Sequence, residues 1–280
     1  MIFIIILVIA FVVYLFIKPY IIQHDTIVLY TGGNGSGKSL FSVRDTLRCL
    51  RRLRWKVRFH NFFERINPIK AIKVCLGKYE YDLFDKPVVY STIPLRINRR
   101  EWSRQLKVEH LMLQEKLPLH SVVFIDEINL LISQMDYKCK GEKALNEFVT
   151  LFRHYTRGFM ILNTQNLSKV HWIFRYCCNE AINLSECKKI PFFYPLIFTS
   201  KVRKITLGDD IKSVETDDAT DKPRVYMLRS LIKHYDTYCF GERYDTVPYD
   251  IYSEFSRYKT NDFRSIDCKI EYKPKTNGGI

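Results

Sequence analysis

Short apolar runs separated by longer mixed stretches dominate the chain after residue 25. Four of them, residues 26–30, 87–95, 122–125 and 158–165, predict strands. A continuous apolar run is typical of a parallel strand that is covered on both faces. Residues 40–53 and 143–157 instead repeat apolar positions at helical spacing, and Leu145, Phe148, Phe152 and Tyr155 are the expected core positions of the second helix. Strands that alternate with helices predict an α/β fold with a mainly parallel sheet flanked by helices.

The first segment of the chain has a different pattern. Residues 2–17 are all apolar, and residues 20–22 resume the run after Lys18 and Pro19. A helix needs about 20 residues to cross a hydrocarbon core of about 30 Å. We therefore expect residues 1–23 to form one transmembrane anchor. All basic residues follow the apolar run, which predicts a single-pass protein with its N-terminus outside and the rest in the cytoplasm.

Two alternatives to an anchor are less consistent with this segment. A cleaved signal peptide would have a basic start and a small-residue cleavage site, and neither pattern is present. A buried core helix at this position would need cover on all sides. Beyond the anchor, we expect residues 24–206 to form the main domain. Residues 207–223 are polar and acidic, and predict a mobile loop that opens a small C-terminal region, 207–280, with a disordered tail.

The charge balance of the chain indicates which kinds of partner it attracts. The formal net charge of +14 favours attraction to nucleic acid or to an anionic membrane surface. Residues 44–59 contribute six Arg and one Lys, with Trp55 among them. We considered three roles for this stretch: contact with DNA phosphates, contact with anionic lipid, or a solvated helix face. Trp55 would suit base stacking on a single strand.

The eight cysteines include no CxxC pair. Reduced thiols are therefore the favoured interpretation, because the spacing suits neither a disulfide framework nor a zinc site. A metal site built from His171, Cys177, Cys178 and Cys187 is a weak alternative, since its spacing matches no standard site.

A glycine-rich stretch follows the first predicted strand and opens the first predicted helix. Gly32, Gly37, Lys38 and Ser39 fit the pattern G-x-x-x-x-G-K-[ST]. Glycines let backbone N–H groups curl around phosphate oxygens, while the lysine reaches the β- and γ-phosphates and the hydroxyl binds Mg²⁺. The alternative is a glycine-rich turn that happens to contain a lysine. We expect an ATP site formed by Gly32, Gly33, Asn34, Gly35, Ser36, Gly37, Lys38, Ser39 and Leu40.

Acidic residues end the predicted strand at 122–125. Asp126 is placed to bind Mg²⁺ together with Ser39, and Glu127 to polarise the attacking water. The alternative is that both residues only cap the following helix. Gln165, at the end of the strand at 158–165, is expected beside them as a sensor of the γ-phosphate.

Arg157 directly precedes that last strand. It is a candidate arginine finger that would act on the site of a neighbouring subunit. Arg153, one turn earlier, is the second candidate. For either residue, a solvated side chain or a partner of the helix dipole is the alternative.

Taken together, these motifs resemble the zonula-occludens-toxin-like (Zot-like) ATPases, the filamentous-phage assembly proteins, within the wider FtsK/HerA group of DNA-pumping P-loop ATPases. The matching pieces are TGGNGSGKS, VVYSTIPL, VVFIDE, FRHYTRGFMILNTQNLSKVHWIFR and KHYDTYCFGERYDT. The resemblance implies a P-loop ATPase that uses ATP and Mg²⁺. It assigns Lys38 and Ser39 to the Walker-A pair, Asp126 and Glu127 to the Walker-B pair, Gln165 to the sensor and Arg157 to the finger.

The resemblance also implies a role for the whole protein. We expect a membrane-anchored ATPase, a homo-oligomeric ring at the host inner membrane, that powers extrusion of a filamentous phage or similar DNA-containing particle. Its partners would be phage export or coat proteins, with single-stranded DNA as a further candidate. In the family the ATPase domain precedes the membrane helix, whereas here the apolar segment comes first. The alternatives are a DNA-packaging or conjugative translocase of the same group, and a membrane scaffold in which ATP binding only switches assembly.

Overall fold

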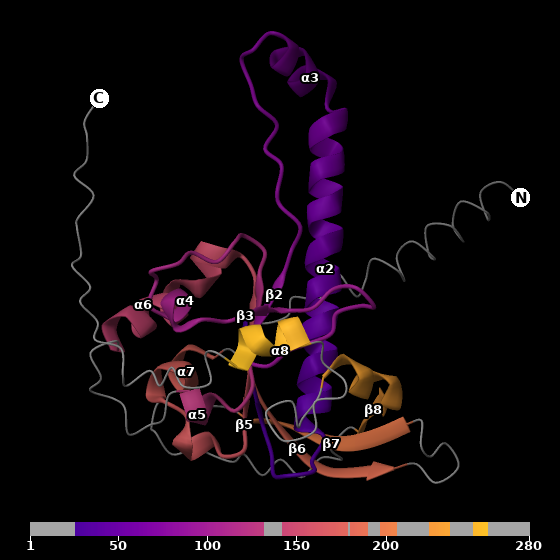
Figure 1. Cartoon of the computed structure of the whole chain (residues 1–280), viewed down its shortest axis with the longest axis vertical. Coiled ribbons are helices and arrows are strands. Elements are labelled where there is room, and N and C mark those ends of the chain that lie inside the picture. The colour runs from indigo at the N-terminus through magenta and orange to yellow at the C-terminus, as the bar shows by residue number, and fades with distance from the viewer. Residues whose placement is uncertain are drawn as a thin grey trace, which may run out of the picture.

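One sheet organises the part of the chain that the computed structural model describes, which is residues 26–131, 142–178, 180–189, 197–205, 224–235 and 249–256. Its strand order is β3-β2-β4-β5-β1-β6-β7-β8 (Figure 1). The pairs from β3 to β6 are parallel, and β7 and β8 add antiparallel pairs at one edge. The strands are β1 Ile27–Thr31, β2 Val89–Ser91, β3 Arg104–Gln105, β4 Val122–Ile125, β5 Phe159–Thr164, β6 Glu180–Lys189, β7 Ile197–Ile205 and β8 Arg224–Leu228.

Helices cover both faces of this sheet. Helix α2 packs on one face, and α4, α6 and α7 pack on the other (Figure 1). The α-helices are α2 Lys38–Ile66, α3 Pro68–Cys75, α4 Val108–Leu111, α5 Ile128–Leu131, α6 Glu142–Thr156, α7 Trp172–Cys177 and α8 Tyr249–Ser256, and the 3₁₀ helices are η2 Leu167–Lys169 and η3 Arg229–His234.

Alternation along β1 shows why its apolar run is unbroken. Val28 and Tyr30 point to the core under α2, whereas Ile27 and Leu29 point to the core under α6 and α7. Successive side chains of a strand face opposite sides, so a strand covered on both sides is apolar at most positions. The prediction of a mainly parallel α/β sheet flanked by helices is thus confirmed for the described residues.

The four predicted strands are present, but the one predicted at 87–95 is shorter. Only Val89–Ser91 pair as β2. The Thr92 side chain instead accepts a hydrogen bond from the Asp126 amide, at 2.9 Å. Pro94, which lacks an amide hydrogen, then prevents further pairing at its position.

The predicted helix at 143–157 is α6, and one of its expected core positions is wrong. Leu145, Phe148 and Phe152 are buried, but Tyr155 is 40 % exposed. Thr156 continues the inward stripe in its place and is 1 % exposed. The Tyr155 hydroxyl donates to Glu147 instead, at 3.3 Å.

The C-terminal region shares the sheet rather than standing apart from it. Strand β8 pairs with β7, and Phe255 of α8 is 2 % exposed. The domain boundary predicted at residues 206 and 207 stays a prediction. The predicted loop at 207–223 and the predicted tail lie outside the described residues.

The predicted membrane anchor, residues 1–23, also lies outside the described residues. Among the helices that are described, none combines the length and the apolar character needed to cross a membrane.

Helix α2 extends beyond residue 59, the end of the basic stretch that the sequence predicts as its continuation. It contains 29 residues, which corresponds to about 43 Å at 1.5 Å per residue. Its first half covers the sheet, while its second half, α3 and the segment that returns to β2 project away from the body (Figure 1). We call residues 55–86 the stalk.

Polar contacts hold the returning segment of the stalk against α2. The Asn61 side chain both donates to and accepts from the backbone of Phe84, at 2.9 and 3.0 Å. At the tip, the Glu64 carboxylate accepts hydrogen bonds from Lys70 of α3 and from the Tyr79 hydroxyl. The Lys70 and Tyr79 hydrogen bonds lower the pKa of Glu64 from 4.5 to about 2.

We predict that Glu64→Gln loosens the tip of the stalk without unfolding the body. Because the folded pKa is depressed, the contribution of Glu64 is complete above pH 4.5 and is lost as the pH falls towards 2. At neutral pH, amide hydrogen exchange at residues 67–75 should be faster in Glu64→Gln and unchanged in β1. Glu115→Gln, which alters an exposed ion pair of Lys107, is the control. Equal exchange in Glu64→Gln and wild type would contradict the assigned role.

Candidate nucleotide site

The glycine-rich loop between β1 and α2 has the backbone conformation that its sequence predicts. Gly35 and Gly37 have φ angles of 76° and 83°, a left-handed region that glycine adopts without a Cβ clash. A Cβ on Gly32 would come within 2.8 Å of the Ser36 hydroxyl oxygen and would also overlap the Leu184 carbonyl oxygen. The loop is therefore built around positions that tolerate no side chain.

The backbone amides of the first turn of α2 lie at the end of this loop. Gly37 is the N-cap, and no side chain caps the helix. The first amides of a helix have no intrahelical acceptor and carry the positive end of its dipole. Ser36 and Leu40 are buried, so the anion-facing groups of this segment are backbone amides and the lysine. This geometry suits a phosphate group.

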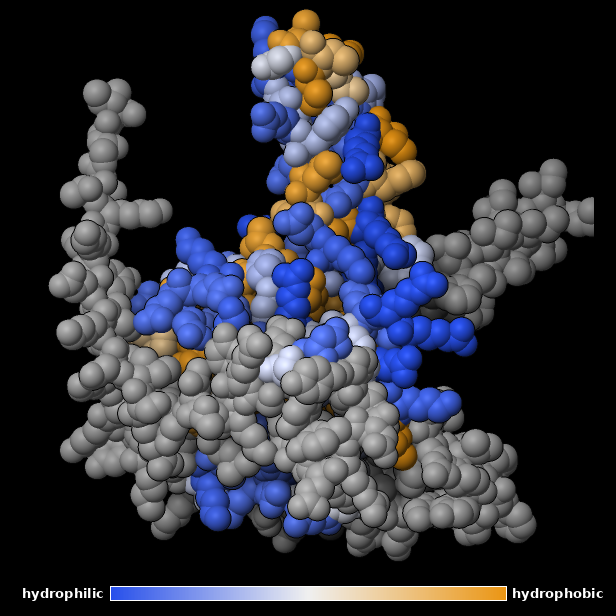
Figure 2. Space-filling model, viewed as in Figure 1, coloured by the Kyte–Doolittle hydropathy of each residue, from blue (hydrophilic) through white to orange (hydrophobic). Residues whose placement is uncertain are grey.

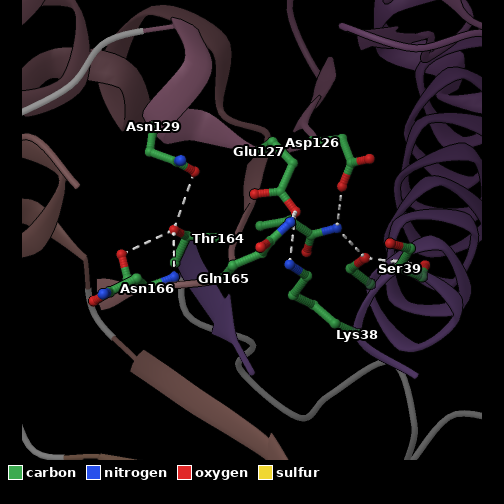
Figure 3. A network of polar contacts seen from close by, with 10 residues as sticks. Lys38, Ser39, Asp126, Glu127, Asn129, Thr164, Gln165 and Asn166 are labelled. Atoms are coloured by element: carbon green, nitrogen blue, oxygen red, sulfur yellow. Dashed lines mark hydrogen bonds and ion pairs between the residues drawn. The ribbon is translucent and has the colours of Figure 1, made fainter. Parts of the chain in front are cut away.

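Three predicted site residues meet in front of the loop (Figure 3). Lys38 Nζ lies 2.8 Å from Glu127 Oε1, and Gln165 Nε2 donates to the same oxygen at 3.1 Å. The exposed fraction of the Lys38 side chain is 7 % and that of Glu127 is 21 %. Glu127 has a φ of 48°, which is uncommon for a residue with a side chain and marks the tight turn from β4 into α5.

Asp126, the neighbour of Glu127, is held by a different strand. Its Oδ1 accepts from Asn163 Nδ2 of β5 at 2.8 Å, and the same amide donates to the Ser42 hydroxyl of α2 at 2.8 Å. Burial and the adjacent Glu127 charge raise the pKa of Asp126, against the lowering effect of the Asn163 hydrogen bond. The half-buried carboxylate would therefore gain from a cation beside it.

The predicted metal ligands, Ser39 and Asp126, lie on the same side of the Lys38–Glu127 pair (Figure 3). Ser39 belongs to the first turn of α2, and Asp126 follows β4. A hydroxyl and a carboxylate are the hard oxygen ligands that Mg²⁺ binds, usually together with water and substrate phosphates.

Comparison with solved structures finds matches of low sequence identity. The N-terminal domain of zonular occludens toxin from Neisseria meningitidis is 14 % identical, with 76 % of this chain and 100 % of that chain covered and a TM-score of 0.41. The genome packaging NTPase of Sulfolobus turreted icosahedral virus 2, in complex with ATP-gammaS, is 18 % identical, with 60 % and 77 % covered and a TM-score of 0.32. No protein-family model matches the chain, and no curated protein is detectably similar to it.

The assignment of the fold rests on the topology and on the loop. Strand β1 leads into the phosphate-binding loop, and β4, which ends in Asp126 and Glu127, lies two positions away with β5 between them. The fold is that of a P-loop NTPase. The strand that carries Gln165 was predicted beside the one that carries Asp126, and their parallel pairing confirms this position.

Arg157 lies far from this cluster within the chain. It precedes β5, whereas Gln165 follows it, so the whole strand of six residues separates them. Strands rise about 3.3 Å per residue, so the eight residues from Arg157 to Gln165 place Arg157 about 26 Å away at the opposite edge of the sheet. Arg157 and Arg153 are both exposed. A role for Arg157 within its own subunit's site is therefore excluded by distance, and its role towards a neighbour stays a prediction.

The residues that sequence reasoning missed are Asn163, Ser42 and Thr92, which hold Asp126 in place. The available signal was Asn163, a polar residue inside the apolar strand FMILNT that is 0 % exposed. Buried amides of this kind are nearly always hydrogen-bonded. Its Oδ1 atom has no hydrogen-bond partner among the residues that the structure describes.

The weak metal-site alternative includes Cys187, whose side chain lies outside the described residues. Among the side chains that the structure describes, no group of three or more His, Cys, Asp or Glu residues could hold a metal ion. His171 instead caps α7, where its ring nitrogen accepts from the Ile173 amide at 3.4 Å.

We predict that Asn163→Leu destabilises the domain and weakens binding of Mg²⁺ with an ATP analogue. The variant keeps the branching of the side chain but removes the Asn163 donor from the half-buried Asp126 carboxylate, which should lower the free energy of unfolding by about 1.5–3 kcal/mol. Denaturant unfolding in detergent solution and titration with the analogue measure the two effects. Asn146→Ala, at an exposed position of α6, should change neither. Wild-type stability of Asn163→Leu would show that Asp126 does not depend on this amide.

Proposed function

We propose that the chain is a Mg²⁺-dependent ATPase that works at a membrane to assemble or extrude a DNA-containing particle. The observation that carries the ATPase part is the cluster of Lys38, Glu127 and Gln165 in front of the uncapped first turn of α2. A pure phosphate-binding turn would need the amides and the lysine. It would not need a carboxylate positioned beside them by a second side chain.

The Lys38–Glu127 ion pair keeps both residues ready before a nucleotide arrives. Lys38 would contact the β- and γ-phosphates, and to do so its ammonium group must leave Glu127. Glu127 then keeps its hydrogen bond from Gln165. Its carboxylate becomes able to accept a proton from water, which is the role of a general base. Phosphate binding and release of the base are in this way coupled through one lysine.

The metal would be held by Ser39 and Asp126. When bound, Mg²⁺ would supply charge neutralisation at the phosphates. The residues of this chain that prepare the site are Asn163, which fixes the Asp126 side chain, and Thr92, which fixes its amide. Both act by orientation.

The membrane and particle parts of the proposal rest on the sequence. Residues 2–17 are apolar and the chain carries a formal net charge of +14, which suits work next to anionic lipid or DNA. The resemblance to Zot-like phage assembly proteins supports extrusion as the task. A motor for this task must be held where the particle leaves and must face the side that contains ATP.

We predict that Glu127→Gln retains ATP binding but lowers turnover by about 10²–10⁴-fold, because it removes the general base. Lys38→Ala should lose binding itself, since the only side-chain cation of the loop is gone. Phosphate release and titration with a fluorescent ATP analogue measure the two properties. Glu147→Gln, which changes a carboxylate of α6 that accepts from Tyr155, should behave like wild type. Normal turnover by Glu127→Gln would reduce Glu127 to a structural residue.

A second prediction tests whether Arg157 acts across a subunit boundary. Lys38→Ala and Arg157→Ala should each be inactive, because a finger contributes about 10³–10⁵-fold to the rate. When the two variants are mixed, some boundaries pair an intact loop with an intact Arg157, and activity should partly return. Pull-down of differently tagged chains must first show that subunits exchange. Full activity of Arg157→Ala alone would remove this residue from the mechanism and leave Arg153 to be tested.

A further inference from the structure

The stalk exposes an apolar face that the proposed ATPase mechanism does not use. On α2, Trp55, Phe59, Phe62, Phe63 and Ile66 are between 46 % and 64 % exposed. At 3.6 residues per turn they fall within a sector of about 100°. The rings of Trp55 and Phe59 stack with centroids 5.4 Å apart, and those of Phe59 and Phe63 with centroids 6.4 Å apart.

Helix α3 continues this face to the tip of the stalk. Ile69, Ile72 and Leu76 are 61–65 % exposed and lie three and four residues apart. Figure 2 shows apolar surface gathered at the tip and along one side of the stalk, with hydrophilic surface beside it. Large exposed apolar patches of this kind mark sites of contact with a protein or a membrane.

Basic side chains border the apolar face. Arg51, Arg58 and Arg65, seven residues apart and all exposed, follow one border, and Lys56 lies on the other. Between residues 51 and 75 there are eight Lys or Arg and one acidic residue. That residue is Glu64, which points inward and pairs with Lys70. An aromatic face flanked by Arg and Lys is the composition of helices that lie in the interface of an anionic bilayer.

The inner side of the stalk has a different role, so the apolar face is not a core that lacks its cover. Val57 and Glu64, on the opposite side of α2, are 4 % and 5 % exposed. His60 and Asn61 bind the returning segment, at Asp82 and Phe84. The stalk thus has a packed inner side and a separate outer face.

The base of the stalk and the start of the described chain lie at the same ends of the parallel strands. Arg54 donates to the Pro87 carbonyl, next to the start of β2, and Met160, near the start of β5, donates to the Thr26 carbonyl. Residue 26 and the base of the stalk are therefore both at the amino ends of the parallel strands. Residue 26, the first described residue, lies at this edge.

This placement gives the stalk a direction. If residues 1–23 span the bilayer, three residues remain before β1, a reach of roughly 10 Å. The part of α2 from residue 55 to residue 66 alone is about 18 Å long. The stalk then meets the lipid surface whether it points towards it or lies along it. This step rests on the anchor of the proposed function, whereas the composition of the stalk does not.

We propose that the stalk is a second membrane-binding element, whose apolar face inserts into the headgroup and acyl boundary of an anionic bilayer. Arg51, Arg58 and Arg65 would contact lipid phosphates, and Phe62 and Ile69 would enter the apolar boundary. The P-loop domain would be held at two points, the anchor and the stalk, which fixes its orientation to the membrane.

The test must separate the stalk from the anchor. We use the full chain with Ile6→Glu and Val13→Glu, which place charges in the predicted anchor. Flotation with vesicles of phosphatidylcholine alone, or of phosphatidylcholine with phosphatidylglycerol, measures binding. This chain should bind the anionic vesicles only. Adding Phe62→Asp and Ile69→Asp should weaken binding by about tenfold or more, because two apolar side chains that would be buried in the bilayer are lost.

Matched variants make the result specific. Tyr176→Asp removes an aromatic residue that is 79 % exposed on α7, and it should leave vesicle binding unchanged. Arg58→Glu with Arg65→Glu should abolish the preference for anionic vesicles. In a chain whose native tryptophans are replaced by Trp55→Phe, Trp102→Phe and Trp172→Phe, a tryptophan introduced by Phe62→Trp should be quenched by lipids brominated on their acyl chains. The substituted positions of the stalk are exposed, so binding of an ATP analogue should persist and reports correct folding.

Each other occupant of the face gives a distinct result that would overturn the proposal. If Phe62→Asp with Ile69→Asp loses binding of a single-stranded oligonucleotide and keeps vesicle binding, the face binds nucleic acid. If it lowers the oligomeric mass and keeps vesicle binding, the face joins copies of this chain. In the absence of lipid, Ile6→Glu and Val13→Glu alone could expose the Phe62→Trp side chain to water. In that case the N-terminal segment covers the apolar face in the unmodified chain. Loss of ATPase activity, by contrast, would concern the proposed function and leave the flotation result unaffected.

Discussion

The parallel pairing of β1, β5 and β4 determines where the polar groups of the nucleotide site lie. Thr31 pairs with Thr164, and Ile125 pairs with Leu162. The glycine-rich loop, Gln165 and the Asp126–Glu127 turn consequently leave the sheet at one edge. Because both faces of the sheet are covered, most strand positions are apolar, and the charged side chains of the site gather where the strands stop. The Lys38–Glu127 ion pair forms across that edge.

The amino ends of the same parallel strands form the opposite side of the sheet, where other features of the chain lie. Arg157, the base of the stalk and the entry of the chain at residue 26 are all found there. The close packing of this edge is visible at Gly158, where a Cβ would overlap the backbone of Ser121. A finger residue here is suited to a neighbouring subunit only, because the sheet separates it from its own site.

Helix α2 connects the two edges as one continuous element. Its first turn carries Lys38 and Ser39, and its last turns carry the aromatic residues of the stalk. Its inward positions over the sheet, such as Val43 and Leu50, are almost fully buried. Since a packed helix moves as a stiff body, a shift of its first turn towards a phosphate would also move the stalk. Nucleotide and membrane contacts, as proposed, would then be coupled through a single helix.

The sequence by itself determined the local features of this protein. The spacing of Gly32, Gly37 and Lys38 predicts a phosphate-binding loop, and four apolar residues before Asp126 predict a buried strand, because both signals are contained in a few consecutive residues. Long-range packing decided the rest. Asn163 holds Asp126 and Ser42 across strands and a helix, and Asn61 holds a segment 23 residues away. Periodicity predicts that Phe59 and Phe63 share a helix face. Only the tertiary structure shows that this face is exposed, because exposure depends on what the rest of the chain places against it.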